Sequence, residues 1–178
     1  AKLASAVCKT ASQDVPIVPG NENRLDGPTR QPNVQQAQVL PNWDHQTEFS
    51  EQSATDFMAD VIRANPNEVV LLAVGPMTNV AELFSKHPDT AGLLKSLQLM
   101  CGRFTDSQQG APKAEWNAHC DPAAASVVYS TTAPGHTSLG LDVTNQVVMD
   151  SSEVRAHFQH PLLQPVLEMS EVWFNERP

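Results

Sequence analysis

The sequence EVVLLAVGP, at positions 68–76, decides the fold of this chain. Its six residues 69–74 are all apolar, and Gly75 and Pro76 then turn the chain. A short, uninterrupted apolar run that ends in a turn is typical of a strand in a parallel sheet, because helices cover such a strand on both faces. We therefore predict a buried parallel strand over 68–74.

Segments with helical periodicity alternate with further short apolar runs on both sides of this strand. Helices are predicted over 1–12, from Ser50 or Ser53 to 64, over 77–87, over 121–130, from Ser151 or Ser152, and from Pro161 through Trp173. Strands are predicted over 15–18, 97–100 and 138–141. This alternation predicts an α/β fold with a mainly parallel sheet flanked by helices. Ligands of such sheets bind beyond the carboxyl ends of the strands, so the loops after Val74, Met100 and Leu141 form the expected binding edge.

The length of 178 residues suits one domain over 1–178. Residues 21–47 are polar and rich in proline, and we expect them to form one long loop of the kind that is usually functional or mobile. This loop contains His45, which is more often simply solvated in such a position than part of a site.

Composition excludes some classes of protein. A formal net charge of −9 without a Lys/Arg cluster argues against a nucleic-acid partner, and no apolar run reaches the length of a membrane span. The three cysteines are odd in number and widely spaced, which fits reduced thiols better than a disulfide framework. We therefore expect a cytoplasmic protein.

The stretch KAEWNAHCDP, at positions 113–122, carries the most suggestive chemistry. Asp121 and Pro122 are the residues expected at the start of a helix, so Glu115 and Asn117 are expected on a loop held by that helix. A carboxylate and an amide side by side suit the vicinal hydroxyls of a sugar, but they equally suit a solvated loop. As a charge on a loop, Glu115 is expected to contribute little to the core.

Several familiar catalytic patterns are absent. The sequence contains no G-x-S-x-G nucleophile elbow, no phosphate loop and no G-x-G-x-x-G. His119 and Cys120 are adjacent, but neighbouring loop residues seldom bond to each other, and no second cysteine lies at zinc spacing. His87 at a helix end is interpreted as a charge partner, and His157 and His160 as surface residues.

Several blocks, in order along the chain, resemble the inosine-uridine preferring nucleoside hydrolase family. They are residues 15–20, 69–81, 99–102, 114–117 with 121–125, and 140–146. The resemblance covers nearly the whole chain. It implies hydrolysis of the N-glycosidic bond of ribonucleosides to ribose and free base, by a metal-dependent enzyme.

The resemblance also implies roles for individual residues. Glu115 and Asn117 would hold ribose hydroxyls, with Met100 lining the sugar site and Trp116 in the same binding loop. Gln109 stands where the family has a sugar-contacting asparagine. The backbone carbonyl of Val74 would be a ligand of the family's calcium ion. The implied partner is a nucleoside or ribose, and a homo-oligomer is possible.

The chain departs from the family pattern at both ends. The family's Asp-rich metal motif and its His-Asp motif are not found among these residues, and Cys101 replaces a glycine. We therefore expect a partial, incomplete nucleoside hydrolase domain that is inactive alone and binds calcium poorly. The alternative is a catalytically inactive nucleoside-binding, ribose-binding or structural homologue. The base preference does not follow from the sequence.

Overall fold

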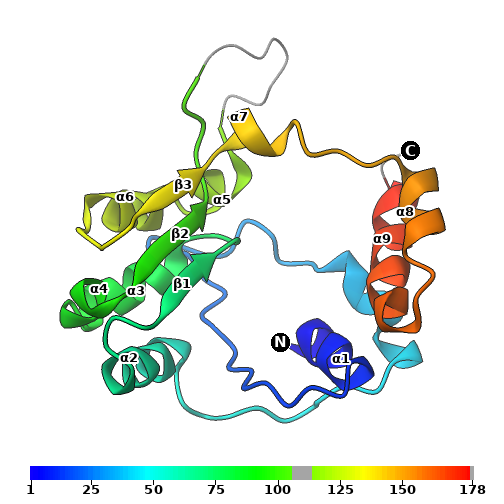
Figure 1. Cartoon of the computed structure of the whole chain (residues 1–178), viewed down its shortest axis with the longest axis horizontal. Helices are drawn as coiled ribbons and strands as arrows, with labels where there is room; N and C mark the ends of the chain where they lie inside the picture. The colour runs from blue at the N-terminus through cyan, green and yellow to red at the C-terminus, as the bar shows by residue number, and fades with distance from the viewer. Residues whose placement is uncertain (106–113, 177–178) are drawn as a thin grey trace. The chain divides into compact units, whose positions relative to one another are not determined.

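The computed structural model describes residues 1–105 and 114–176 (Figure 1). The chain divides into two compact units. Unit 1 comprises Ala1–Pro19, Gln31–Glu51 and Val148–Pro178, and unit 2 comprises Gly20–Arg30 and Gln52–Val147. Within the described residues, no helix is both long and apolar enough to cross a bilayer.

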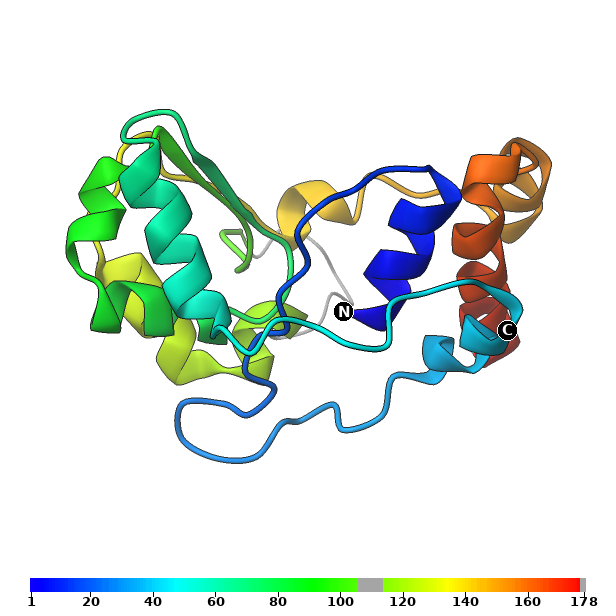
Figure 2. The same cartoon turned by 90° about the horizontal axis from the view of Figure 1, so that it is seen from below.

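Unit 2 contains a parallel three-stranded sheet with the order β1-β2-β3. Its strands are β1 (Val70–Ala73), β2 (Ser96–Met100) and β3 (Thr137–Leu139). Helices α2 (Ala54–Ala64), α3 (Thr78–Lys86), α4 (Asp89–Leu93), α5 (Trp116–Cys120), α6 (Pro122–Ser130) and α7 (Leu141–Thr144) connect and flank the strands (Figures 1 and 2). The predicted α/β class with a parallel sheet is confirmed.

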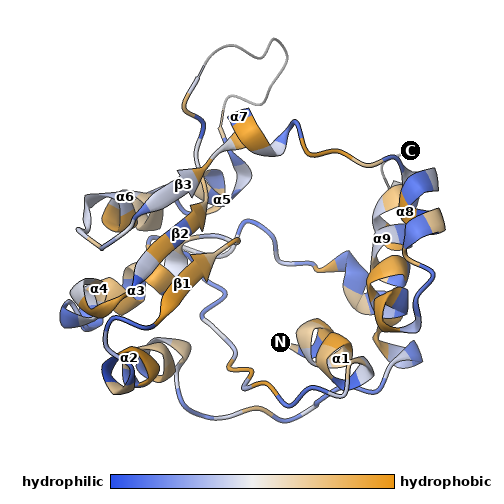
Figure 3. Ribbon diagram, in the orientation of Figure 1, coloured by the Kyte–Doolittle hydropathy of each residue, from blue (hydrophilic) through white to orange (hydrophobic). Residues whose placement is uncertain are grey.

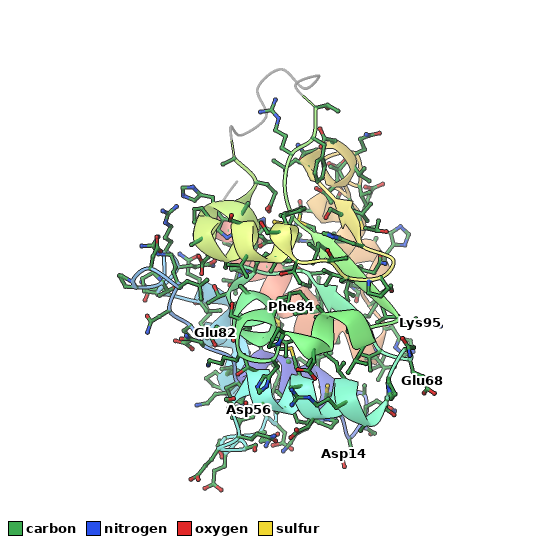
Figure 4. The ribbon with its side chains drawn as sticks, turned by 90° about the vertical axis from the view of Figure 1, so that its left-hand side faces the viewer. Asp14, Asp56, Glu68, Glu82, Phe84 and Lys95 are labelled. Atoms are coloured by element: carbon green, nitrogen blue, oxygen red, sulfur yellow. The ribbon has the colours of Figure 1, made fainter. Side chains whose placement is uncertain are left out.

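The core of unit 2 lies between one face of the sheet and the helices. Leu97 and Leu99 of β2 are buried there, with Leu71 and Ala73 of β1 packed beside them. The helices contribute Ala59 and Ile62 from α2, Val80, Ala81, Leu83 and Phe84 from α3, Ala91 from α4, and Ala124, Ala125 and Val128 from α6. Figure 4 labels Phe84 of this core and the exposed Glu68, which precedes β1 by two residues. This packing places the carboxyl ends of all three strands at one edge, because the strands are parallel.

Within the described residues the other face of β1 is largely exposed, which differs from the prediction that helices cover this strand on both faces. Val70 is 50% exposed, Leu72 is 65% exposed and Val74, just beyond the strand, is 66% exposed. Apolar character alone does not reveal which face of a strand finds a partner, because burial is decided by elements distant in sequence. Figure 3 shows the strongly apolar colouring of β1.

Unit 1 is helical in its described residues. It contains α1 (Lys2–Thr10), the 3-10 helix η1 (Gln35–Asn42), α8 (Ser151–His157), η2 (Pro161–Leu163) and α9 (Gln164–Glu176). Glu168 of α9 accepts hydrogen bonds from Asn42 Nδ2 at 2.9 Å and from Trp43 Nε1 at 3.0 Å. Arg155 of α8 pairs with Glu171 of α9 at 2.6 Å. The segment 21–47, predicted to be one long loop, therefore includes a 3-10 helix that is tied to α9.

The structure corrects several local predictions. The strand expected over 15–18 does not form, because Pro16 has no N–H to donate and no described strand pairs with the segment. Asp150, and not Ser151 or Ser152, is the N-cap of α8, where it forms a capping box with Glu153. The third strand stops at Leu139, and Leu141 begins helix α7.

Two predicted helix starts are confirmed. Ser53 caps α2 by accepting a hydrogen bond from the backbone N–H of Asp56. Asp121 caps α6, and its Oδ1 accepts from the backbone N–H of Ala124 at 3.0 Å. Both follow the local rule that a short polar side chain satisfies a free N–H of the first helical turn.

Asp121 does more than cap one helix. Its Oδ2 accepts from the hydroxyl of Thr78, the first residue of α3, at 2.7 Å and from the backbone N–H of Leu25 at 2.9 Å. The side chain is fully buried. Burial by itself would raise the pKa of Asp121, but the hydrogen bonds from Ala124, Thr78 and Leu25 outweigh it and lower the pKa below its ordinary value.

We predict that Asp121→Ala lowers the free energy of unfolding by about 2–4 kcal/mol, because it removes a helix cap and leaves buried donors unsatisfied. Urea denaturation at neutral pH measures the change. The control is Asp60→Ala on the exposed side of α2, which is expected to change stability by less than about 0.5 kcal/mol. Equal stability of the two variants would contradict this role of Asp121.

Candidate functional site

Glu115 lies at the start of α5, a short helix that the sequence reasoning missed. Its Oε1 accepts from the backbone N–H of Asn117 at 2.7 Å, and its Oε2 accepts from that of Ala118 at 2.9 Å. Oε2 also accepts from the N–H of Gly102, just after β2, at 3.2 Å. Only 3% of Glu115 is exposed, so the expectation that it contributes little to the core is wrong. A carboxylate offers about four lone-pair positions, of which three accept from backbone N–H groups and a fourth accepts from the weak thiol donor of Cys101.

Asn117 and Met100 lie together beside Glu115. Asn117 Nδ2 donates to the backbone carbonyl of Met100 at 2.8 Å and lies 3.4 Å from its sulfur. Within the described residues, no donor reaches Asn117 Oδ1, so this oxygen can accept a hydrogen bond from a ligand hydroxyl. Three of the predicted sugar-site residues are therefore brought to one place, at the carboxyl end of β2.

Trp116 points to a different side of α5. Its ring lies 5.9 Å from that of His119, and 52% of its surface is exposed. Arg30 donates from Nη1 to the backbone carbonyl of His119 at 2.5 Å and lies 3.2 Å from the ring nitrogens. Trp116, His119 and Arg30 thus form an outer patch, whereas Glu115 and Asn117 are on the buried side of the same helix.

The cysteines near Glu115 are poorly suited to nucleophilic chemistry. Burial, together with the negative charge of Glu115, raises the pKa of the Cys101 thiol to about 11. Burial also raises the pKa of Cys120, while the ring of the adjacent His119 faces Arg30. A thiol–imidazole pair is therefore not formed by His119 and Cys120.

Two candidate positions remain, Val74 and Gln109. Val74 follows β1 directly, and Ala73 is paired with Leu99, so Val74 lies at the same sheet edge as Met100. Gln109 is outside the described residues. In the described part of the chain, no three His, Cys, Asp or Glu side chains are grouped so that they could hold a metal ion. A single neutral carbonyl at Val74 does not fit calcium, which prefers six to eight oxygen ligands.

Asp142 is a second carboxylate at this edge of the sheet. The sequence did not predict its hydrogen-bond partners. It lies in the first turn of α7, after β3, and binds the segment that follows β2. Its Oδ2 accepts from the N–H of Phe104 at 2.7 Å, and its Oδ1 accepts from the N–H and hydroxyl of Thr105 at 2.8 and 2.6 Å. The available signal was its place directly after the strand predicted over 138–141.

Comparison with known proteins now identifies the family. The family model described as "Inosine-uridine preferring nucleoside hydrolase" matches residues 1–176. The chain belongs to this family. Two solved structures share its fold: a plant nucleoside hydrolase at 19% identity and a TM-score of 0.81, and a purine-preferring ribonucleoside hydrolase from Gardnerella vaginalis at 21% identity and a TM-score of 0.79. They cover 96% and 99% of this chain, which in turn covers 57% and 60% of theirs.

Curated relatives of this nucleoside hydrolase family member show the same relation in sequence. The chain is 32% identical over 174 residues to a pyrimidine-specific ribonucleoside hydrolase RihA from Shewanella oneidensis, covering 94% of this chain and 49% of that protein. It is 35% identical over 104 residues to a probable uridine nucleosidase 2 from Oryza sativa subsp. japonica, covering 58% of this chain and 31% of that protein. The chain thus spans half or less of the length of these two relatives.

We predict that Glu115→Gln lowers the free energy of unfolding by about 1–3 kcal/mol. Glutamine has one acceptor oxygen, so its NH₂ group must face at least one of the three backbone N–H donors that Glu115 satisfies. Chemical denaturation of the variant and of the exposed control Glu68→Gln measures the difference. If Glu115→Gln were as stable as Glu68→Gln, the buried carboxylate would not hold α5.

Proposed function

We propose that the intact protein hydrolyses the N-glycosidic bond of ribonucleosides, and that this chain supplies part of its ribose site. The observation that carries the proposal is the grouping of Glu115, Asn117 and Met100 at the carboxyl end of β2. Two relatives, a probable uridine nucleosidase and a pyrimidine-specific ribonucleoside hydrolase, support a nucleoside substrate.

The geometry suits recognition of a sugar. Asn117 is held by its bond to the Met100 carbonyl, which leaves Oδ1 to accept from a hydroxyl. At Glu115 a ribose hydroxyl would replace the weak thiol donor of Cys101. Both groups are fixed before a ligand arrives, so little side-chain freedom is lost on binding. We propose Trp116 and Gln109 as further contributors to substrate binding.

The same arrangement explains how these residues would assist bond cleavage. As the glycosidic bond breaks, positive charge develops on the sugar ring, and a nearby carboxylate stabilises it. Glu115 can supply that negative charge without moving, because three backbone N–H groups hold it. Its hydrogen bond to a ribose hydroxyl would strengthen as the ring becomes positive.

The described residues alone do not fit a metal ion. We propose calcium as the ion of the intact enzyme on the ground of the family resemblance, with the Val74 carbonyl as one ligand. Most of its ligands would then come from residues other than those described. We also propose that the protein is cytoplasmic and that residues 1–178 belong to one domain. A homo-oligomer is a further possibility that this proposal includes.

We predict that Asn117→Ala and Glu115→Gln in the intact protein lower kcat and kcat/KM together, by about 10- to 100-fold, because each removes an interaction that is strongest in the transition state. Release of reducing sugar from inosine and uridine measures turnover. Asn33→Ala, at an exposed position in unit 1, is the control and should retain activity. Assays below the unfolding temperature of each variant separate catalysis from stability. Unchanged turnover in both site variants would remove them from the site.

We also predict that the 178-residue chain alone binds calcium weakly, because Val74 offers one carbonyl and no group of three metal-ligating side chains is found in the residues described. Calorimetric titration of the chain with calcium chloride tests this. Tight binding at one-to-one stoichiometry would show that Asp121 or Asp142 gives up its hydrogen bonds to ligate the ion.

A further inference from the structure

Phe104 is a large apolar side chain at the carboxyl edge of the sheet that the ribose site does not use. It follows β2 by a few residues, and 58% of its surface is exposed. Single exposed apolar side chains are common on protein surfaces and by themselves indicate nothing. The surroundings of Phe104 distinguish it, because its backbone and its ring are both held in place.

Asp142 holds the backbone. Its carboxylate accepts from the N–H of Phe104 and from the N–H and hydroxyl of Thr105, so three donors from two consecutive residues converge on one side chain. The hydroxyl of Thr105, followed by the N–H of Phe104, lowers the pKa of Asp142 to about 2. The carboxylate is therefore charged at neutral pH, which strengthens these hydrogen bonds.

Two glycines leave room for the ring. A Cβ atom at Gly140 would lie 2.8 Å from Cδ2 of Phe104 and 2.7 Å from the carbonyl oxygen of Gly102, so no larger residue fits there without displacement. At Gly102 a Cβ would lie 3.2 Å from Cζ of Phe104, and the φ of +94° also favours glycine. The ring thus occupies the space that side chains at Gly140 and Gly102 would fill, while more than half of the residue stays exposed.

The ring is next to the proposed ribose site. The N–H of Gly102 donates to Glu115 Oε2, and a Cβ atom at the same glycine would lie within 3.2 Å of the Phe104 ring. The carbonyl of Gly102 accepts from the N–H of Leu141, which joins the ends of β2 and β3 at this point. Gly102 therefore lies between the Phe104 ring and the Glu115 carboxylate that would hold the sugar.

We propose that Phe104 determines substrate specificity by stacking on the heterocyclic base of the nucleoside whose ribose is held at Glu115 and Asn117. The inference rests on the proposed function. Every nucleobase has a flat aromatic face, and a side chain that is already fixed loses little conformational freedom when a base stacks on it. Glu115 and Asn117 satisfy polar sugar hydroxyls, and Phe104 adds the apolar surface that the other half of a nucleoside requires.

The test uses binding of pseudouridine to the full-length protein, because its carbon–carbon glycosidic bond is not a substrate for N-glycoside hydrolysis. Calorimetry of wild type, Phe104→Ala and Phe104→Tyr is compared with that of ribose. Phe104→Ala should weaken pseudouridine binding about tenfold or more, leave ribose binding unchanged, and be rescued by Phe104→Tyr, which keeps an aromatic face. Trp173→Leu, at a partly exposed aromatic residue of α9 in unit 1, is the matched control and should bind like wild type.

The outcomes separate this inference from the proposed function. If wild type and Phe104→Ala bind pseudouridine equally, base stacking by Phe104 is overturned and the nucleoside site stands. If ribose binding falls as much as pseudouridine binding, the ring supports the sugar site and does not contact the base, which also overturns the inference. If wild type binds neither ligand and releases no sugar from inosine or uridine, the proposed function fails first.

Discussion

Two buried carboxylates, Glu115 and Asp121, hold together the part of unit 2 on which the remaining structure depends. Each is the N-cap of a helix: Glu115 caps α5 and Asp121 caps α6. Asp121 is also the C-cap residue of α5. Glu115 reaches back to the N–H of Gly102 after β2, and Asp121 reaches the hydroxyl of Thr78 in the helix after β1. Free N–H groups at the starts of helices must be satisfied, so these two side chains join two helix starts to the exits of two strands.

This arrangement makes the same groups serve both the fold and the proposed binding site. Glu115 accepts three hydrogen bonds from backbone N–H groups, and the Asn117 amide donates one to the Met100 carbonyl. The consequence is a site that is rigid before ligand binding, which favours recognition but couples any change in the site to stability. A loss of activity in a Glu115 variant therefore has to be compared with the loss of folding stability in the same variant.

Local rules account for the features that were predicted correctly. The caps at Ser53 and Asp121 follow from side-chain chemistry, and the strand after Lys95 follows from an apolar run. Features that depend on distant partners were missed or wrong. No described strand pairs with 15–18, and α5 begins at Glu115, which accepts from the N–H of Gly102 beyond the end of β2. The grouping of Glu115, Asn117 and Met100 was expected from family resemblance, since no spacing rule connects a strand end to a loop residue fifteen positions later.

The open face of β1 affects how the purified protein is handled. In the described sheet β1 is an edge strand, with a row of backbone donors and acceptors on its free side and Val70, Leu72 and Val74 on its uncovered face. Such an edge is a template for strand addition between molecules, and natural sheets protect it with a charged side chain such as lysine. Leu72→Lys would place a charge at the middle of this edge, and it is the substitution that should keep concentrated solutions of the chain free of aggregates.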